Sequence, residues 1–141
     1  MAYDFQVTID SATPHDLADW WAEALGWQVE PSDEEFIRSM VEQGHAGEQD
    51  TMHHHGELVW VEGAAIVNPT GGAPRVLFQR VPEPKSVKNR VHLDVRVGVE
   101  NVAAEVERLT AQGATVLHHG QQGPHRWVTI ADPEGNELCL T

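Results

Sequence analysis

The sequence predicts an α+β fold built from two β-α-β-β-β modules. The chain has 141 residues, enough for one compact domain with its own core. In each half, a segment with period-two hydrophobic alternation precedes an amphipathic helical pattern that ends at a glycine, and several short apolar segments follow. Because this order occurs twice, we expect a first module at about 1–84 and a second at about 90–141.

The first module begins with a predicted strand at Phe5–Asp10, in which apolar and polar residues alternate. A helix is expected from Thr13, a favourable N-cap followed by Pro14, to Gly26, which can adopt the left-handed conformation of a C-cap. Its apolar residues follow the i, i+3, i+4, i+8 spacing of a buried stripe: Leu17, Trp20, Trp21 and Leu25. Further strands are expected at Trp27–Glu30, Leu58–Glu62, Ala64–Val67 and Val76–Val81.

A helical insertion is expected inside the first module at about 32–44. Ser32–Glu35 has the composition of a capping box, and an amphipathic stripe follows it and stops at Gly44. The segment from His45 to Gly56 is polar and contains several glycines and histidines, so it is expected to be a loop.

The second module begins with the predicted strand Val91–Val97. Its alternate positions carry valine or leucine, whereas His92, Asp94 and Arg96 share the opposite face. Three ionisable side chains on one face are either solvated or line a pocket. A helix from Asn101 to Gly113 and three strands complete the module: Thr115–His118, Trp127–Ile130 and Glu137–Leu140.

Composition restricts the classes of partner. The formal net charge is −13, from 22 acidic and 9 basic residues, which argues against binding to nucleic acid or to anionic membranes. The sequence has neither a signal-peptide pattern nor an apolar run of about 18 residues. Cys139 is the only cysteine, so no internal disulfide can form. We expect a cytoplasmic protein.

Two motifs resemble those of a known superfamily: Phe78–Asp94 (FQRVPEPKSVKNRVHLD) and Asp132–Leu140 (DPEGNELCL). With them, the chain resembles the vicinal oxygen chelate superfamily of glyoxalases, bleomycin resistance proteins and extradiol dioxygenases. It is most similar to glyoxalase-like proteins of the actinobacterial type. The resemblance implies a single glyoxalase-like domain at 1–141, whose curved mixed sheets surround a cleft between the modules, and a homodimer.

The resemblance also implies four positions for a divalent metal ion, which fall on Gln6, Gln79, His92 and Cys139. Metal-dependent relatives carry a glutamate where Cys139 stands, and Glu137 is two residues away, roughly 6.6 Å along a strand. Ligand bonds to zinc are only about 2.0–2.3 Å long, so Glu137 cannot replace the missing glutamate without a register change. In this set only the imidazole of His92 is a strong metal ligand; the two amides bind divalent ions weakly, and the thiol is a soft ligand. We therefore expect no cofactor and keep a divalent metal as an alternative.

His92 is the candidate catalytic residue. Its ring can be a pocket histidine bonded to Asp94, or an acid, base or substrate anchor. Cys139 is expected to be a small buried hydrophobe, and a nucleophilic role would need His92 or a cation nearby to lower its pKa. The candidate ligand-binding residues are Gln6, Gln79, Lys88, Arg90, His92, Asp94, Glu137 and Cys139.

Five of the nine basic residues lie close together in the sequence: Arg75, Arg80, Lys85, Lys88 and Arg90. They can pair with carboxylates of the same chain, or they can anchor an anionic ligand or a dimer partner. The run His53–His55 is expected to capture transition metals adventitiously.

Three functions follow. The leading hypothesis is a protein that binds a small organic molecule in the cleft between the modules and acts as a lyase or isomerase through His92 without the standard metal. One alternative is a drug-sequestering protein similar to bleomycin-resistance proteins. The other is a divalent-metal-dependent lyase or dioxygenase with altered ligands. A site around Lys88, Arg90 and His92 predicts an anionic ligand, whereas sequestration of a cationic drug predicts acidic walls.

Overall fold

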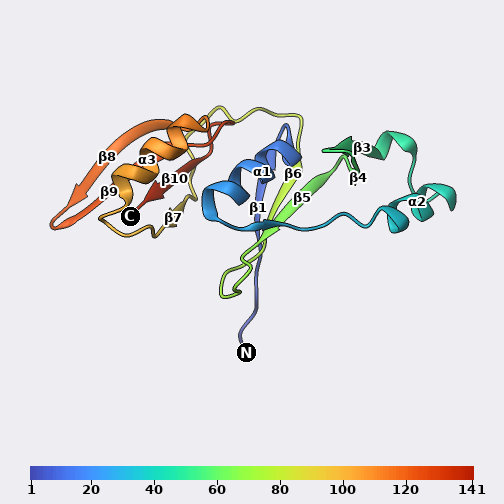
Figure 1. The fold of residues 1–141 in the computed structure, drawn as a ribbon, viewed down its shortest axis with the longest axis horizontal. Helices are drawn as coiled ribbons and strands as arrows, with labels where there is room; N and C mark the ends of the chain where they lie inside the picture. The colour runs from blue at the N-terminus through green and yellow to red at the C-terminus, as the bar shows by residue number, and fades with distance from the viewer. The chain divides into compact units, whose positions relative to one another are not determined.

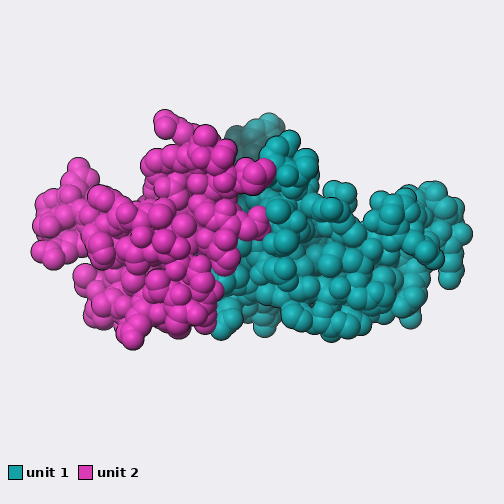
Figure 2. Space-filling model, turned by 90° about the horizontal axis from the view of Figure 1, so that it is seen from above, with its two compact units in different colours: residues 1–83 teal, residues 84–141 magenta.

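A computed structural model describes residues 1–141, which form two compact units, Met1–Glu83 and Pro84–Thr141 (Figure 2). The chain contains ten strands and three α-helices, and each unit has a curved mixed sheet with a helix beside it (Figure 1). The predicted α+β class is confirmed.

Unit 1 has a four-stranded sheet in the order β1-β6-β5-β2. Strand β1 is parallel to β6, and the other neighbours are antiparallel. The elements of this β-α-β-β-β arrangement are β1 (Val7–Ser11), α1 (Pro14–Leu25), β2 (Gln28–Val29), β5 (Gly63–Val67) and β6 (Val76–Arg80).

Helix α1 packs on one face of this sheet. Pro14 occupies its first turn, and Gly26 ends it with a φ of 67°, in the left-handed region that favours glycine. Trp21 is buried, and its ring centroid lies 6.4 Å from that of Phe78 in β6. Because side chains alternate along a strand, Val76 and Phe78 face the core under α1, whereas Leu77 and Gln79 face the opposite side.

The insertion in unit 1 contains α2 (Glu34–Glu42), a short 3₁₀ helix η1 (Glu48–Asp50) and the hairpin of β3 (Thr51–His54) and β4 (Glu57–Trp60). The prediction of a loop from His45 to Gly56 is therefore wrong. The sequence of β3, TMHH, does not alternate between apolar and polar residues, so hydrophobic periodicity does not indicate this strand.

The start of α2 also differs from the expected capping box. Asp33 is the N-cap, and its Oδ1 accepts a hydrogen bond of 3.0 Å from the backbone N–H of Phe36. The Ser32 hydroxyl instead donates to the carbonyl of Leu58, and the Glu34 carboxylate accepts from the N–H of Leu58 at 2.7 Å. These two residues attach α2 to β4.

Unit 2 has the sheet order β7-β10-β9-β8, so its first and last strands are again parallel neighbours. Its elements are β7 (Leu93–Val95), α3 (Val102–Ala111), β8 (Thr115–Gln122), β9 (His125–Ala131) and β10 (Glu137–Leu140). Strand β7 is shorter than the predicted Val91–Val97, because only Leu93–Val95 pairs with β10 and Val91 is 79% exposed. Strands β8 and β9 are longer than predicted, because they continue as a hairpin toward Gly123.

The core of unit 2 lies between α3 and its sheet. Leu109 of α3 is buried, as are Ile130 of β9 and Leu138 and Leu140 of β10. None of the helices is long and apolar enough to cross a membrane. The cytoplasmic location stays a prediction.

Gly120 in β8 provides a test of the packing in unit 2. It lies opposite Trp127, and a Cβ atom at this position would be 2.0 Å from Cε2 of the indole. Gly120→Ala is expected to displace the ring and lower the free energy of unfolding by about 1–3 kcal/mol. Urea denaturation measures the effect, with His119→Ala at the exposed neighbouring position as the control. Equal stability of Gly120→Ala and wild type would contradict the packing described.

Candidate functional site

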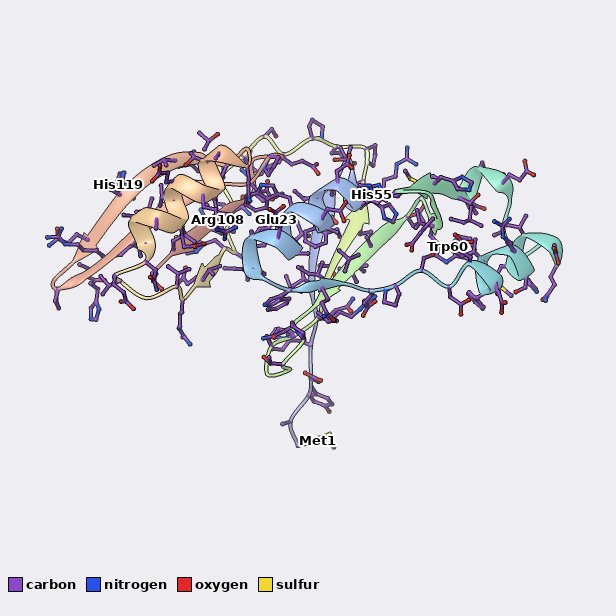
Figure 3. All side chains as sticks on the ribbon, in the orientation of Figure 1. Met1, Glu23, His55, Trp60, Arg108 and His119 are labelled. Atoms are coloured by element: carbon purple, nitrogen blue, oxygen red, sulfur yellow. The ribbon has the colours of Figure 1, made fainter.

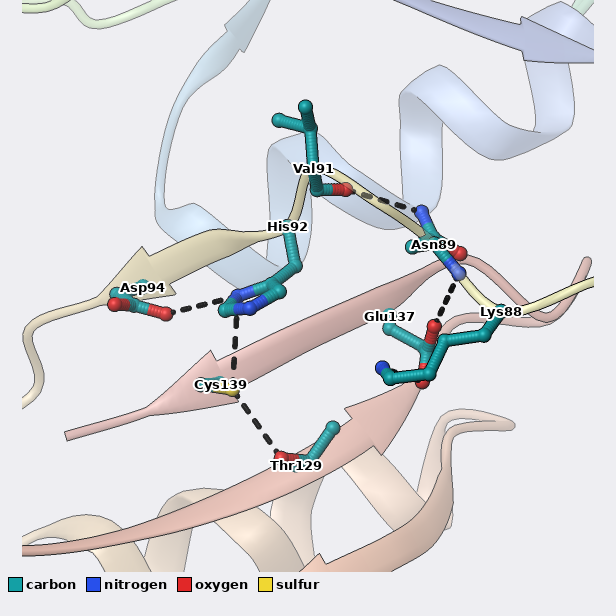
Figure 4. A network of polar contacts seen from close by, with 8 residues as sticks. All are labelled: Lys88, Asn89, Val91, His92, Asp94, Thr129, Glu137 and Cys139. Carbon is teal, nitrogen blue, oxygen red and sulfur yellow. Dashed lines mark hydrogen bonds and ion pairs between the residues drawn. The ribbon is translucent and has the colours of Figure 1, made fainter.

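The parallel pairing of β7 with β10 gathers five of the predicted site residues on one face of the unit 2 sheet (Figure 4). Cys139 lies opposite Asp94, and Leu138 lies opposite Leu93. Since alternate residues of β10 face opposite sides, Leu138 points into the core and Cys139 faces the other side. The gathered residues are Lys88, His92, Asp94, Glu137 and Cys139.

His92 is held by Asp94 and remains accessible. Its Nδ1 lies 3.1 Å from Oδ1 of Asp94 and 3.9 Å from Sγ of Cys139, and its side chain is 42% exposed. A carboxylate beside Nδ1 favours the neutral tautomer in which Nδ1 carries the hydrogen. Nε2 then keeps its lone pair, which can accept a hydrogen bond or a proton.

Cys139 is buried and faces conditions that favour the protonated thiol. Its Sγ lies 3.2 Å from Oγ1 of Thr129. Burial raises the pKa of the Cys139 thiol; the contact with Thr129 opposes this shift, and the carboxylate of Asp94 adds to it. Because the thiolate is the nucleophilic and metal-binding form, this environment works against both roles.

Glu137 of β10 binds the segment that precedes β7. Its carboxylate accepts hydrogen bonds from Nζ of Lys88 at 2.8 Å and from the backbone N–H of Asn89 at 2.6 Å. The Lys88 hydrogen bond, followed by that of Asn89, holds the pKa of Glu137 below its usual range against the effect of burial. Lys88 is thus neutralised within the chain, whereas Arg90 is exposed and makes no ion pair.

The unit 1 candidates do not lie together. Gln6 precedes β1, and its Oε1 accepts a hydrogen bond of 3.0 Å from Nη1 of Arg75. Gln79 of β6 lies opposite Asp10, four residues beyond Arg75, which directly precedes this strand, or roughly 13 Å along the chain. If Gln79 corresponds to Cys139, the register places Thr8, rather than Gln6, where His92 lies in unit 2.

The difference arises from the connections between the first strand and the helix. Asp10 and Asp94 occupy matching register positions, but α1 begins at Pro14 whereas α3 begins only at Val102. The two units therefore differ in the number of residues between the first strand and the glycine that follows the helix. For this reason, the distances of Gln6 from Gly26 and of His92 from Gly113 do not align β1 with β7.

The residues at the family's metal positions do not fit a divalent ion. Gln6, Thr8 and Gln79 offer only neutral oxygen or nitrogen atoms, and the raised pKa of Cys139 disfavours the thiolate ligand. Two groups of three possible ligand residues do occur in the chain: His92, Asp94 and Cys139, and separately Asp19, His54 and His55.

Unit 1 contains a pocket of about 800 Å³ that sequence reasoning did not find, because the insertion forms part of its wall. Arg75 pairs with Glu30 through two hydrogen bonds of 2.8 Å, and Phe36 and Trp60 contribute aromatic surface. The hydrogen bonds to Arg75 hold the pKa of Glu30 below its usual range. The charged side chains of the wall are mostly acidic, with five carboxylates: Asp19, Glu30, Asp33, Glu57 and Glu62.

The repeated β-α-β-β-β unit and the family match define a member of the vicinal oxygen chelate superfamily. Residues 6–141 match the model of the glyoxalase-like domain, and the chain belongs to that family. No curated protein sequence matches the chain.

Solved structures share the fold at low sequence identity. One is a mutant of the fosfomycin resistance protein FosX from Listeria monocytogenes, complexed with Mn(II) and a dihydroxypropylphosphonic acid: 9% identity, TM-score 0.65, 99% of this chain and 91% of that chain. Another is a glyoxalase/bleomycin resistance protein/dioxygenase family enzyme from Burkholderia phytofirmans. It is 16% identical, with a TM-score of 0.64, and the match covers 96% of this chain and 94% of that chain. A third is the oxidase ChaP-H2, which is 13% identical, with a TM-score of 0.61; the match covers 99% of this chain and 93% of that chain.

The lowered pKa of Glu137 predicts a pH-dependent contribution to stability. A carboxyl whose folded-state pKa lies below its unfolded value stabilises the fold above the unfolded pKa, and the contribution disappears as the pH falls through the folded pKa. The loss of stability in Glu137→Gln should therefore be largest above about pH 5 and shrink toward pH 3. Urea denaturation across this range measures it. Lys88→Gln should show the same trend, and a loss independent of pH would contradict the assignment.

The environment of Cys139 predicts low thiol reactivity. At pH 8 the folded protein should react with a disulfide reagent such as DTNB on the order of 100-fold more slowly than the urea-unfolded chain, because the thiol is buried and its pKa is raised. Equal rates in the two states would show an accessible thiolate and would reopen the nucleophilic role.

Proposed function

We propose that this chain binds a small organic molecule on the His92 face of the unit 2 sheet and that His92 acts on it through Nε2. The observation behind the proposal is the arrangement of the ring: Asp94 holds Nδ1 at 3.1 Å, while the side chain stays 42% exposed. A half-exposed imidazole oriented by a carboxylate is an arrangement suited to general acid–base chemistry.

The chemistry would be proton transfer. Neutral His92 accepts a proton from an acidic C–H or O–H group of the ligand, and the electron pair of the broken bond stays on the ligand. The carboxylate of Asp94 stabilises the imidazolium that forms. Return of the proton to a different atom gives an isomerisation, and expulsion of a leaving group gives a lyase reaction. A positioned acid–base group of this kind contributes about 10²–10⁴-fold to a rate.

The charges around His92 favour a ligand that is neutral or carries a single negative charge. Lys88 is paired with Glu137, and Asp94 adds a negative charge beside the ring. Arg90 makes no ion pair, and neither do Lys85 and Arg96, the other cations near His92 in the sequence. FosX, which has a similar fold, is complexed with a small phosphonic acid; this likeness supports a small organic ligand only by analogy of fold.

Sequestration of a cationic molecule is the second candidate function. It is supported by the acidic wall of the unit 1 pocket, where Arg75 is the only arginine or lysine and is already paired with Glu30. Aromatic rings of Phe36 and Trp60 beside carboxylates suit an organic cation. A homodimer remains part of the proposal, supported by the exposed apolar side chains of Val87 and Val91.

The His92 proposal is tested with a library of small organic acids and carbonyl compounds, screened by ¹H–¹⁵N NMR on the full chain. Bound compounds should shift the amide signals of Thr129 and Cys139. His92→Ala should weaken their binding at least about tenfold while changing stability by no more than about 1–2 kcal/mol. His119→Ala, an exposed histidine of the same unit, should bind as wild type does.

Equal affinity in wild type and His92→Ala would contradict the assignment. A parallel screen of small organic cations tests the second candidate: binding confined to these cations and weakened by Glu62→Gln would support it instead. Turnover of a bound compound, followed by mass spectrometry, separates an enzyme from a protein that only binds.

A further inference from the structure

A second group of polar side chains joins helix α1 to the inserted hairpin of unit 1. Oδ2 of Asp19 lies 2.7 Å from Nε2 of His54 and also 2.7 Å from Nε2 of His55, although 35 and 36 residues separate them in the sequence. The side chain of His54 is only 16% exposed, and that of Asp19 is 36% exposed. His55 is labelled at the hairpin in Figure 3. One carboxylate oxygen thus contacts two imidazoles.

The spacing of these atoms suits a shared metal ion. The three ligand atoms all lie within 4.8 Å of one another. Ligands of a zinc ion, at about 2.0–2.2 Å from the metal, lie roughly 3.3–3.6 Å apart in a tetrahedral site. Small side-chain rotations therefore suffice to admit an ion. Two imidazole nitrogens and one carboxylate oxygen are donors that zinc accepts, whereas calcium and magnesium prefer oxygen alone.

The surroundings of His54 also fit a ligand role. Its other nitrogen, Nδ1, lies 3.9 Å from Oδ1 of Asp16, so a carboxylate is present on the far side of the ring. This distance is too long for a hydrogen bond, so Asp16 acts on the ring by its charge; hydrogen on Nδ1 would leave the Nε2 lone pair for an ion. His15 lies beside it, with ring centroids 5.1 Å apart, and its Nε2 contacts the carbonyl of Trp60 at 2.7 Å.

The turn of the hairpin does not by itself require a histidine. His55 is the only non-glycine residue with positive φ, at 50°, and Gly56 follows it at 81°. A two-residue hairpin loop with positive φ at both positions is a type I′ turn, which favours asparagine, aspartate or glycine at the first position. Histidine at this position satisfies the turn less well, but it directs an imidazole onto Asp19.

We propose that Asp19, His54 and His55 bind one divalent ion of the zinc type, which links the β3–β4 hairpin to α1. Three protein ligands leave a fourth coordination position for water or a small molecule. The same three residues line the acidic unit 1 pocket, so a ligand of that pocket can reach the ion. The site uses none of the positions that the family resemblance implies.

Adventitious capture by the run His53–His55 is the competing explanation, and it makes different demands on the residues. Capture by adjacent histidines depends on His53 as much as on its neighbours and is indifferent to Asp19. His53 is exposed and is not part of the group, so His53→Ala is a matched control. His55→Asn removes the imidazole and keeps a residue that the turn favours. Asp19→Asn removes the charge at nearly constant shape.

The experiment titrates ZnCl₂ into the untagged full-length chain, stripped with EDTA, by isothermal titration calorimetry, and records the visible spectrum with Co²⁺. We expect one ion per chain and a tetrahedral Co²⁺ spectrum. Asp19→Asn and His55→Asn should each weaken zinc binding by about 100-fold or more, since even outer-sphere partners are typically worth about 10–100-fold. His53→Ala should stay within about twofold of wild type.

Thermal unfolding gives a second readout. Zinc should raise the Tm of wild type and of His53→Ala, because an ion bound only by the folded state stabilises it, and should leave the Tm of His55→Asn unchanged. Absence of stoichiometric binding would overturn the proposal. Equal weakening by His53→Ala and His55→Asn, or wild-type affinity in Asp19→Asn, would overturn it as well and would identify the binding as adventitious.

Discussion

The parallel pairing between the first and the last strand of each unit is the constraint on which the arrangement of polar residues depends. In unit 2 it sets Asp94 opposite Cys139 and brings His92 beside both, although more than forty residues separate the two strands in the sequence. Because side chains alternate along β10, Leu138 and Leu140 pack in the core with α3, and the opposite face of the strand is available for polar residues. A shift of one residue would exchange these faces and bury Glu137.

The same arrangement carries different chemistry in the two units. In unit 1 the matching face holds Leu77 and Gln79, and the insertion adds a pocket whose carboxylates outnumber its single arginine. In unit 2 the face holds an imidazole–carboxylate pair and the ion pair of Lys88 with Glu137. The acidic excess of the chain is therefore not shared equally by the candidate sites: five carboxylates and one arginine line the unit 1 pocket, whereas charges of both signs lie around His92. This contrast is why the two candidate functions call for ligands of different charge.

Much of the fold was predictable, because hydrophobic periodicity is a local property and it occurs in both units. The hairpin strand Thr51–His54 was not predictable, since its sequence TMHH shows no alternation of apolar and polar residues. The grouping of His92, Asp94 and Cys139 followed from strand parity and family resemblance. By contrast, the meeting of Asp19 with His54 and His55 depends on how the insertion packs on α1, and the five clustered basic residues divide between two units. Such tertiary contacts leave no mark in local sequence.

The central claim is that Asp94 orients His92 so that Nε2 carries the free lone pair. Long-range ¹H–¹⁵N NMR of the histidine rings at pH 8 measures this directly, because protonated and unprotonated ring nitrogens have well-separated ¹⁵N shifts. The structure predicts the Nδ1–H tautomer for His92, lost in Asp94→Ala. A ring protonated at Nε2, or a tautomer unaffected by removal of Asp94, would contradict the claim and leave His92 without the lone pair that the proposed chemistry requires.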